Sequence, residues 1–146
     1  MIINLAMLRL IGDDIDGFAC LVGHEAAHIA KGHAEAGRTR GNTLQGIGTL
    51  VGLGLGAAGV PAAGTIAGLG MDLVETVYSR EDEREADVAG VSYVMSAGYD
   101  PYGAVRIHEK LLKASGGSLL PFLSSHPSGE ERIENLKAII QAKNSQ

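Results

Sequence analysis

The sequence contains no tryptophan, and aromatic residues make up only 4% of its 146 residues. Hydrophobic residues nevertheless make up 45%, so we predict a core of leucine, isoleucine, valine and alanine with closely packed glycines. Cys20 is the single cysteine, which excludes an internal disulfide. It is expected to be a small buried hydrophobe rather than a nucleophile. The formal net charge of −5 comes without a basic stripe, so nothing indicates a nucleic-acid partner.

The first ten residues are apolar, but they lack the basic leader and the small-residue cleavage site of a signal peptide. Residues 2–4 could end a strand, too short to form a sheet alone. A chain of this length is expected to fold as one domain over residues 1–146. Because the patterns that follow are helical almost throughout, we predict a mainly α fold.

An HExxH motif begins at His24. Residues four apart share one face of a helix, so His24 and His28 can bind one metal ion, for zinc at about 2.0–2.1 Å. Glu25 directly follows His24 and so lies beside the face that carries the two histidines, where its carboxylate can reach a water bound to that ion. Apolar neighbours such as Phe18 and Ile29 predict that this helix is buried. The motif indicates a metal-dependent hydrolase, although the pattern alone is weak evidence.

Capping residues predict where the two central helices begin and end. Asp14 is a good N-cap for the helix that carries the motif, which we expect to run to about residue 36. Ser79 and Asp82 resemble a capping arrangement for a second helix over residues 79–97.

Two further helices are predicted in the C-terminal third of the chain. The first opens at Asp100-Pro101, and the second follows a capping box of Ser128 and Glu131. The apolar positions expected to face the core are Ile107, Leu111 and Leu112 in the first, and Ile133, Leu136 and Ile140 in the second.

Residues 41–71 form an uncharged, glycine-rich insert between the two central helices. Its length and its small residues four apart are compatible with a membrane segment. Pro61 interrupts the run and no aromatic belt flanks it, which favours a hairpin of two short helices packed on the domain. Membrane association is the alternative, and so much glycine would also suit a mobile cover over an active site.

A catalytic zinc usually takes three protein ligands and leaves one position for water. His33 lies five residues after His28 and so off the shared face, whereas His108 lies among charged residues, where we expect it to be solvated. Glu83 is the best candidate, because Asp87 follows one turn later on the same stripe. There a carboxylate could accept the ring N–H of a ligand histidine and fix its tautomer.

Three motifs in this order are together far more specific than HExxH alone. They are HEAAH at residues 24–28, SREDEREAD at residues 79–87, and SHP at residues 125–127 followed by Arg132-Ile133. In this combination the chain resembles the CAAX-prenyl-protease/HtpX-like family of zinc metallopeptidases, which are gluzincins with a glutamate as the third ligand. The resemblance covers most of the chain. It implies a gluzincin-like catalytic domain that binds one Zn2+ per chain and acts on polypeptides.

The same resemblance implies a role for each matching residue. His24, His28 and Glu83 bind zinc, and Glu25 is the general base. Asp87 supports a ligand histidine through a hydrogen bond.

The resemblance places His126 and Arg132 near the site as well. From the resemblance and its position in a loop, we interpret His126 as the hydrogen-bond donor to the tetrahedral oxyanion. The alternatives are a plain loop residue beside a proline, or a latch that ligates zinc in a closed state. Arg132 is expected to be a structural partner of a nearby carboxylate.

Family members usually carry an upstream strand with a Pro-Gly-Gly-type turn, and a peptide binds such an edge by adding a strand. Here only residues 2–4 match its tail, so we expect an N-terminally truncated domain whose small β-sheet is largely missing. Two functions follow: a zinc endopeptidase, or a weakly active or inactive zinc-stabilised module that binds proteins as a chaperone does. The resemblance indicates a bacterial cell envelope or periplasm, and the sequence does not give the oligomeric state.

Overall fold

The computed structural model describes residues 5–39, 78–114, 126 and 128–145. Over these residues the chain forms helices and turns without any strand, which confirms the prediction of a mainly α fold. The strand predicted at residues 2–4 and the insert at residues 41–71 lie outside the described residues. None of the described helices is both long enough and apolar enough to cross a membrane.

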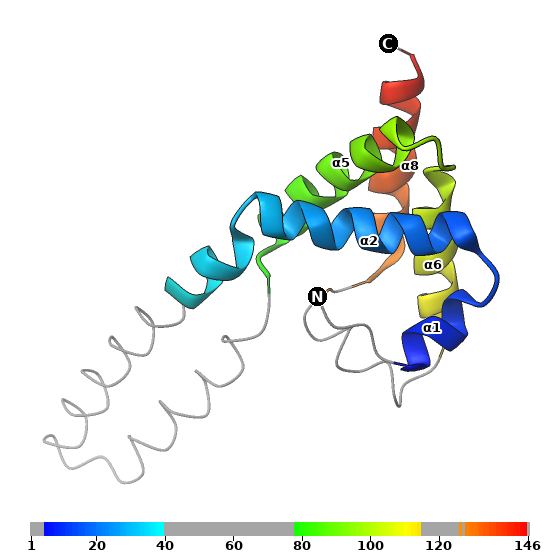
Figure 1. Ribbon diagram of the computed structural model, residues 1–146, viewed down its shortest axis with the longest axis horizontal. Helices are drawn as coiled ribbons and strands as arrows, with labels where there is room; N and C mark the ends of the chain where they lie inside the picture. The colour runs from blue at the N-terminus through cyan, green and yellow to red at the C-terminus, as the bar shows by residue number, and fades with distance from the viewer. Residues whose placement is uncertain (1–4, 40–77, 115–125, 127, 146) are drawn as a thin grey trace, which may run out of the picture.

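The HExxH motif lies on the central helix α2, Ile15–Ala30. Helix α5, Arg80–Ser96, runs beside α2 in the opposite direction and is its main packing partner (Figure 1). Helix α6, Tyr102–Lys113, packs against α2 as well, and α8, Glu130–Asn144, covers α5 and α6. The short helix α1, Leu5–Ile11, lies against α6 and α2. Three of the described helices, α1, α5 and α6, therefore pack against the motif helix, and α8 packs behind two of them.

The pair α2 and α5 approaches closely because glycines face each other where the helices meet. A Cβ atom on Gly90 would lie 3.0 Å from both Cα and the backbone nitrogen of His24. One on Gly23 would lie 2.9 Å from the Val94 side chain. Any side chain at these positions would push α5 away from the imidazoles of α2. The close approach lets short acidic side chains of α5 reach those imidazoles.

The buried hydrophobic side chains form two clusters and, within the described residues, include no aromatic ring, as the composition predicts. Cys20 is buried too, and burial raises its pKa to about 12, so the thiol stays protonated as expected of a small buried hydrophobe. The first cluster consists of Met7, Ile11, Leu21, Ile107 and Leu111. The second consists of Val91, Val105, Ile133, Leu136 and Ile140.

The predicted caps of the two central helices are confirmed. The Asp14 carboxylate accepts the backbone N–H of Gly17 at 2.9 Å. The Ser79 hydroxyl accepts the N–H of Asp82 at 3.1 Å, and the Asp82 carboxylate accepts the N–H of Ser79 at 2.9 Å. These bonds satisfy donors that would otherwise be unpaired at the helix ends.

Two helix boundaries differ from the prediction. Helix α2 ends at Ala30 rather than near residue 36, because Gly32 adopts a left-handed backbone with φ +69° before helical structure resumes over residues 33–39. Helix α6 begins at Tyr102, one residue later than predicted. The Asp100 side chain still accepts the Tyr102 N–H, at 3.0 Å.

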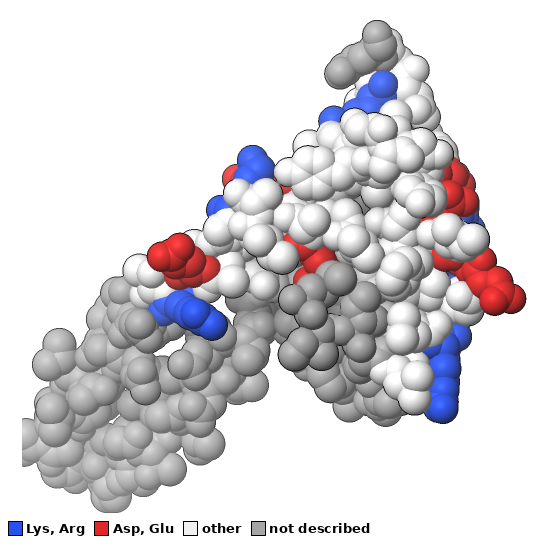
Figure 2. All heavy atoms as spheres, in the orientation of Figure 1, with Lys and Arg blue, Asp and Glu red and all other residues white. Residues whose placement is uncertain are grey.

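The prediction that the motif helix is buried is confirmed for the face that carries His24 and His28 and is wrong for the other face. Phe18 is 41% exposed and Ile29 is 69% exposed, because α5 and α6 cover the opposite side of α2. Leu112, expected to face the core, is 46% exposed as well. Figure 2 shows a broad uncharged area over α2 and α5, with the charged side chains mostly at its margins.

Asp14 also joins α2 to α6 through an ion pair. Its two carboxylate oxygens accept hydrogen bonds from the Arg106 guanidinium at 2.9 and 3.0 Å. The hydrogen bond from Arg106 is the main cause that lowers the pKa of Asp14 from 3.8 to about 2. Because the pKa is lower in the folded state, this contribution to stability is present well above pH 3.8 and is lost as the pH falls through about 2.

Replacing Asp14 with asparagine tests this linkage. Asp14→Asn keeps an oxygen that can cap α2 but removes the charge, so we expect a loss of about 0.2–1 kcal/mol at pH 7. The difference from the parent protein should shrink as the pH approaches 2. Urea unfolding between pH 7 and pH 2 measures both, with Asp13→Asn at the neighbouring exposed residue as the control. A destabilisation that does not change with pH would contradict the assignment.

Candidate metal centre

Two buried imidazoles lie one turn apart on α2. His24 is 8% exposed and His28 is 2% exposed, and their Nε2 atoms are 3.0 Å apart. Helix α5 adds the buried carboxylate of Glu83. Its Oε1 atom is 3.2 Å from His28 Nε2, and its Oε2 atom is 3.5 Å from His24 Nε2. The structure thus brings together the two histidines and the glutamate that the sequence singled out.

His126, which precedes α8, completes this group. Its Nδ1 atom is 2.8 Å from Glu83 Oε1 and 3.4 Å from His24 Nε2. Its Nε2 atom faces the other way, 3.3 Å from Glu25 Oε1. One donor atom from each of His24, His28, Glu83 and His126 lies within 4.8 Å of every other. These four residues could hold a metal ion.

The chemistry of this donor group fits zinc. Zinc binds imidazole nitrogen and carboxylate oxygen at about 2.0–2.2 Å in a tetrahedron, which sets neighbouring donors roughly 3.4 Å apart. The separations given above run from 2.8 to 3.5 Å. Glu83 Oε2 is buried, and its contacts in the described part of the chain are an ion pair with Arg132 and the His24 Nε2 atom at 3.5 Å. A cation would relieve both the crowding of lone pairs and the buried negative charge.

Asp87 and Arg132 surround the donor group on the side of α8. The His24 Nδ1–H donates to the Asp87 carboxylate at 2.9 Å, which leaves the Nε2 lone pair directed at the other donors. Arg132 donates to the two Asp87 oxygens at 2.7 and 2.9 Å and also contacts the Glu83 carboxylate. Burial raises the pKa of Asp87, but the His24 hydrogen bond and the Arg132 charge outweigh it and lower that pKa below its usual value.

The Glu83 carboxyl is held in its charged form. Burial raises its pKa, but the hydrogen bonds with three imidazoles and the positive charge of Arg132 outweigh that effect, so its pKa lies well below the usual range. Burial lowers the pKa of His28, which favours the neutral imidazole. A charged carboxylate beside a neutral imidazole is the protonation state that metal binding requires. Burial lowers the pKa of His24, but the hydrogen bonds to Asp87 and Glu83 outweigh it and raise that pKa, so a metal ion would displace a proton from this ring.

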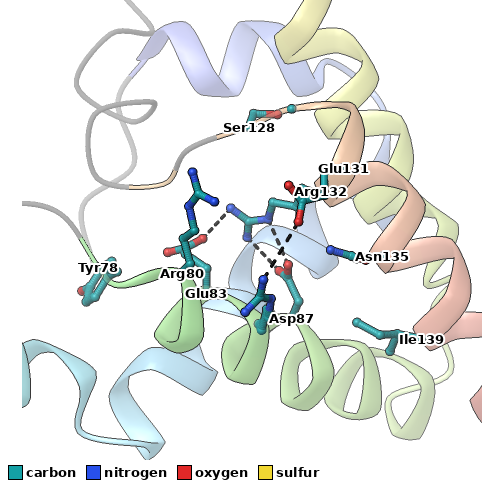
Figure 3. Close-up of a pocket in the computed structure, with 11 residues that line it drawn as sticks. Tyr78, Arg80, Glu83, Asp87, Ser128, Glu131, Arg132, Asn135 and Ile139 are labelled. Carbon is teal, nitrogen blue, oxygen red and sulfur yellow. Dashed lines mark hydrogen bonds and ion pairs between the residues drawn. The ribbon is translucent and has the colours of Figure 1, made fainter.

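A cavity of about 210 Å³ opens beside the donor group, between α5 and α8. Figure 3 shows Glu83, Asp87 and Arg132 pointing toward one another along its wall, with Tyr78 at one end. The Tyr78 ring stacks on the imidazole of His28, with ring centroids 3.9 Å apart. The carboxylate of the donor group can therefore be reached from this cavity.

His108 is a functional-site neighbour that the sequence did not indicate. It is only 7% exposed, so the prediction of a solvated side chain is wrong. Its Nδ1 atom is 2.8 Å from the Ser128 hydroxyl, and burial lowers its pKa to about 3, so the ring is neutral. The predicted capping box of Ser128 and Glu131 is also wrong, because Ser128 bonds to His108 and α8 has Gly129 as its N-cap without a side-chain bond.

Residues 2–140 match the family model described as Peptidase family M48. The chain belongs to peptidase family M48. This membership confirms the resemblance to the HtpX-like zinc metallopeptidases and the expectation of a metalloprotease domain. No solved structure matches the chain.

Curated relatives support the same family. Over 119 aligned residues, the chain is 38% identical to the mitochondrial metalloendopeptidase OMA1 of Arabidopsis thaliana. The aligned residues make up 81% of this chain and 23% of the relative. The chain is 26% identical over 117 residues to the metalloprotease LoiP of Escherichia coli, and this match covers 80% of this chain and 46% of the relative. It is 26% identical over 147 aligned positions to the β-barrel assembly-enhancing protease of Escherichia coli, and this match covers 94% of this chain and 30% of the relative.

These three M48 relatives are all named as proteases, which favours a peptidase over the alternative of an inactive binding module. The chain spans less than half the length of each of them. The matches therefore show the family of this chain and not the activity or substrates of a whole M48 protein.

Substituting Ser128 tests the link between α6 and the segment that carries His126. We expect Ser128→Ala to lower the free energy of unfolding by about 1–3 kcal/mol, because the buried Nδ1 atom of His108 loses its partner. Ser128→Thr keeps the hydroxyl and should remain close to the parent protein. Urea unfolding of the three proteins measures the difference, and an alanine variant of unchanged stability would contradict the proposed bond.

Proposed function

We propose that this chain is the catalytic domain of a zinc endopeptidase that hydrolyses peptide bonds in polypeptide substrates. The observation that carries the proposal is the convergence of four buried donor atoms from three separate segments, with the Glu25 carboxylate beside them. Membership of peptidase family M48 supports the same reaction class.

In this proposal His24, His28 and Glu83 hold one Zn2+ per chain. Each has a donor atom in the group, and each is buried. Asp87 orients His24 through the bond to Nδ1, as the resemblance implies. Arg132 contacts both buried carboxylates and offsets part of their charge, which supports the predicted structural role.

When bound, zinc would polarise the scissile carbonyl and lower the pKa of the attacking water. Glu25 lies next to the donor group on α2 without belonging to it, and it is only partly buried. We assign it the general-base role: its carboxylate accepts the water proton and delivers it to the leaving amine. A base must be within hydrogen-bond reach of that water, and the distance of 3.3 Å from Glu25 to His126 places it at the edge of the group.

His126 has two roles in this proposal. As the predicted oxyanion donor, its ring N–H would stabilise the negative charge that develops on the carbonyl oxygen. In the arrangement described above, its Nδ1 atom lies among the metal donors instead, which corresponds to the latch alternative. The donor role therefore requires the imidazole to turn away from Glu83 when a substrate binds.

Two predictions about the surroundings of the enzyme stay open to experiment. Membrane association through residues 41–71 concerns residues outside those described. The bacterial cell envelope or periplasm is supported by the resemblance and by the relative named for β-barrel assembly, whereas another relative is named as mitochondrial. We keep the envelope location as part of the proposal.

Glu25→Gln tests the proposed function directly. The amide cannot accept the water proton, so we expect peptide hydrolysis to fall by at least about 100-fold while one zinc per chain is retained. Cleavage of an unstructured fluorogenic peptide and elemental analysis of zinc measure the two quantities. Glu35→Gln, at an exposed glutamate beyond the site, is the matched control. Full activity in the Glu25 variant would remove the assignment.

His126→Phe separates the two roles of His126. The oxyanion-donor role predicts a fall in kcat of about 100–1,000-fold with zinc retained, because three ligands remain. Steady-state kinetics and zinc analysis of the same preparation check this. An increase in kcat would instead show that His126 acts as a latch.

A further inference from the structure

His33 is a buried histidine that the proposed mechanism does not use. It is 5% exposed and lies outside the four-donor group of the described residues. Gly32 ends the regular helix with φ +69°. The chain then turns, and His33 Nδ1 comes to 2.9 Å from His28 Nδ1. The turn thus places this imidazole directly behind a proposed zinc ligand.

Two nitrogens at this distance share one proton, and the surroundings decide which ring carries it. His28 Nε2 lies 3.0 Å from His24 Nε2 and 3.2 Å from Glu83 Oε1. In the proposed zinc site this nitrogen binds the metal ion, so its lone pair must be free. A neutral His28 ring with a free Nε2 carries its proton on Nδ1. His28 Nδ1–H then donates, and His33 Nδ1 accepts.

The acceptor ring is itself held in the matching tautomer. With Nδ1 free, His33 carries its proton on Nε2. That nitrogen faces two carboxylates, Glu85 Oε2 at 3.7 Å and Asp82 Oδ1 at 4.0 Å. Both negative groups favour a proton on Nε2 rather than on Nδ1. The Tyr78 ring stacked on His28 fixes the plane of the donor ring at the same time.

We infer that His33 is a positioning residue that sets the tautomer and orientation of His28 for metal binding. The inference rests on the proposed zinc site. It parallels the contact of His24 with Asp87, at the same distance of 2.9 Å. Here the acceptor is a neutral imidazole rather than a charged carboxylate. Partners of this kind typically change metal affinity by about 10–100-fold.

Two substitutions at one position test the inference. In His33→Leu the acceptor is lost while a side chain of similar bulk fills the space. In His33→Asn the side-chain oxygen lies near the place of Nδ1 and can still accept the bond. We expect the zinc Kd to rise about 10–100-fold for the leucine variant and to stay within about threefold of the parent protein for the asparagine variant. Competition with a chromophoric chelator measures these values.

Readouts other than activity distinguish positioning from packing. The visible absorption bands of the Co2+-loaded protein should change in the leucine variant and be restored by asparagine. Nitrogen-15 chemical shifts of the zinc-loaded parent protein should show a protonated Nδ1 in His28 and a protonated Nε2 in His33. A role in packing alone would favour the apolar leucine over the polar asparagine in both zinc affinity and thermal stability.

The outcomes are separable. A leucine variant that binds zinc as tightly as the parent protein, or an asparagine variant that binds as weakly as leucine, overturns the role of His33 and leaves the zinc site standing. A parent protein that binds no zinc overturns both. Thermal unfolding of the metal-free proteins shows whether either variant has lost the fold, and a leucine variant that is weak only because it is unfolded also counts against the inference.

Discussion

The structure depends on the burial of one carboxylate, Glu83, among three imidazoles and a guanidinium. Taking a charge out of water costs several kcal/mol unless partners compensate for it. Here the partners come from α2, from His126 in the segment that precedes α8, and from α8 itself, so the charge itself ties separate segments together. Glycines at the α2–α5 contact make this possible, because they let α5 approach until its short acidic side chains reach the rings.

The same arrangement serves stability and chemistry. Asp87 and Arg132 neutralise one another and orient His24, while His108 and Ser128 join α6 to the segment that precedes α8. Each buried histidine outside the donor group therefore has a hydrogen-bond partner within the described residues. Glu25, the proposed general base, lies at the margin of this network and is only partly buried.

Local patterns predicted much of this because their physics is local. The spacing of His24 and His28 requires only the pitch of a helix, and the caps at Asp14 and Ser79 involve residues three positions apart. The stripe of Glu83 and Asp87 also follows from helical periodicity. Ser128 shows where such reasoning ends: its sequence context favours a cap, but the hydroxyl bonds instead to a histidine twenty residues earlier.

The sequence by itself determined the helical class, the motif pair on α2, the acidic stripe on α5 and, through three ordered motifs, the peptidase family. The tertiary structure decided which histidines are buried, that α2 leaves Phe18 and Ile29 exposed, and that His33 turns back behind His28. The difference has one physical cause. Periodicity and capping act within a turn or two of helix, whereas burial and the pairing of buried charges depend on which helices meet.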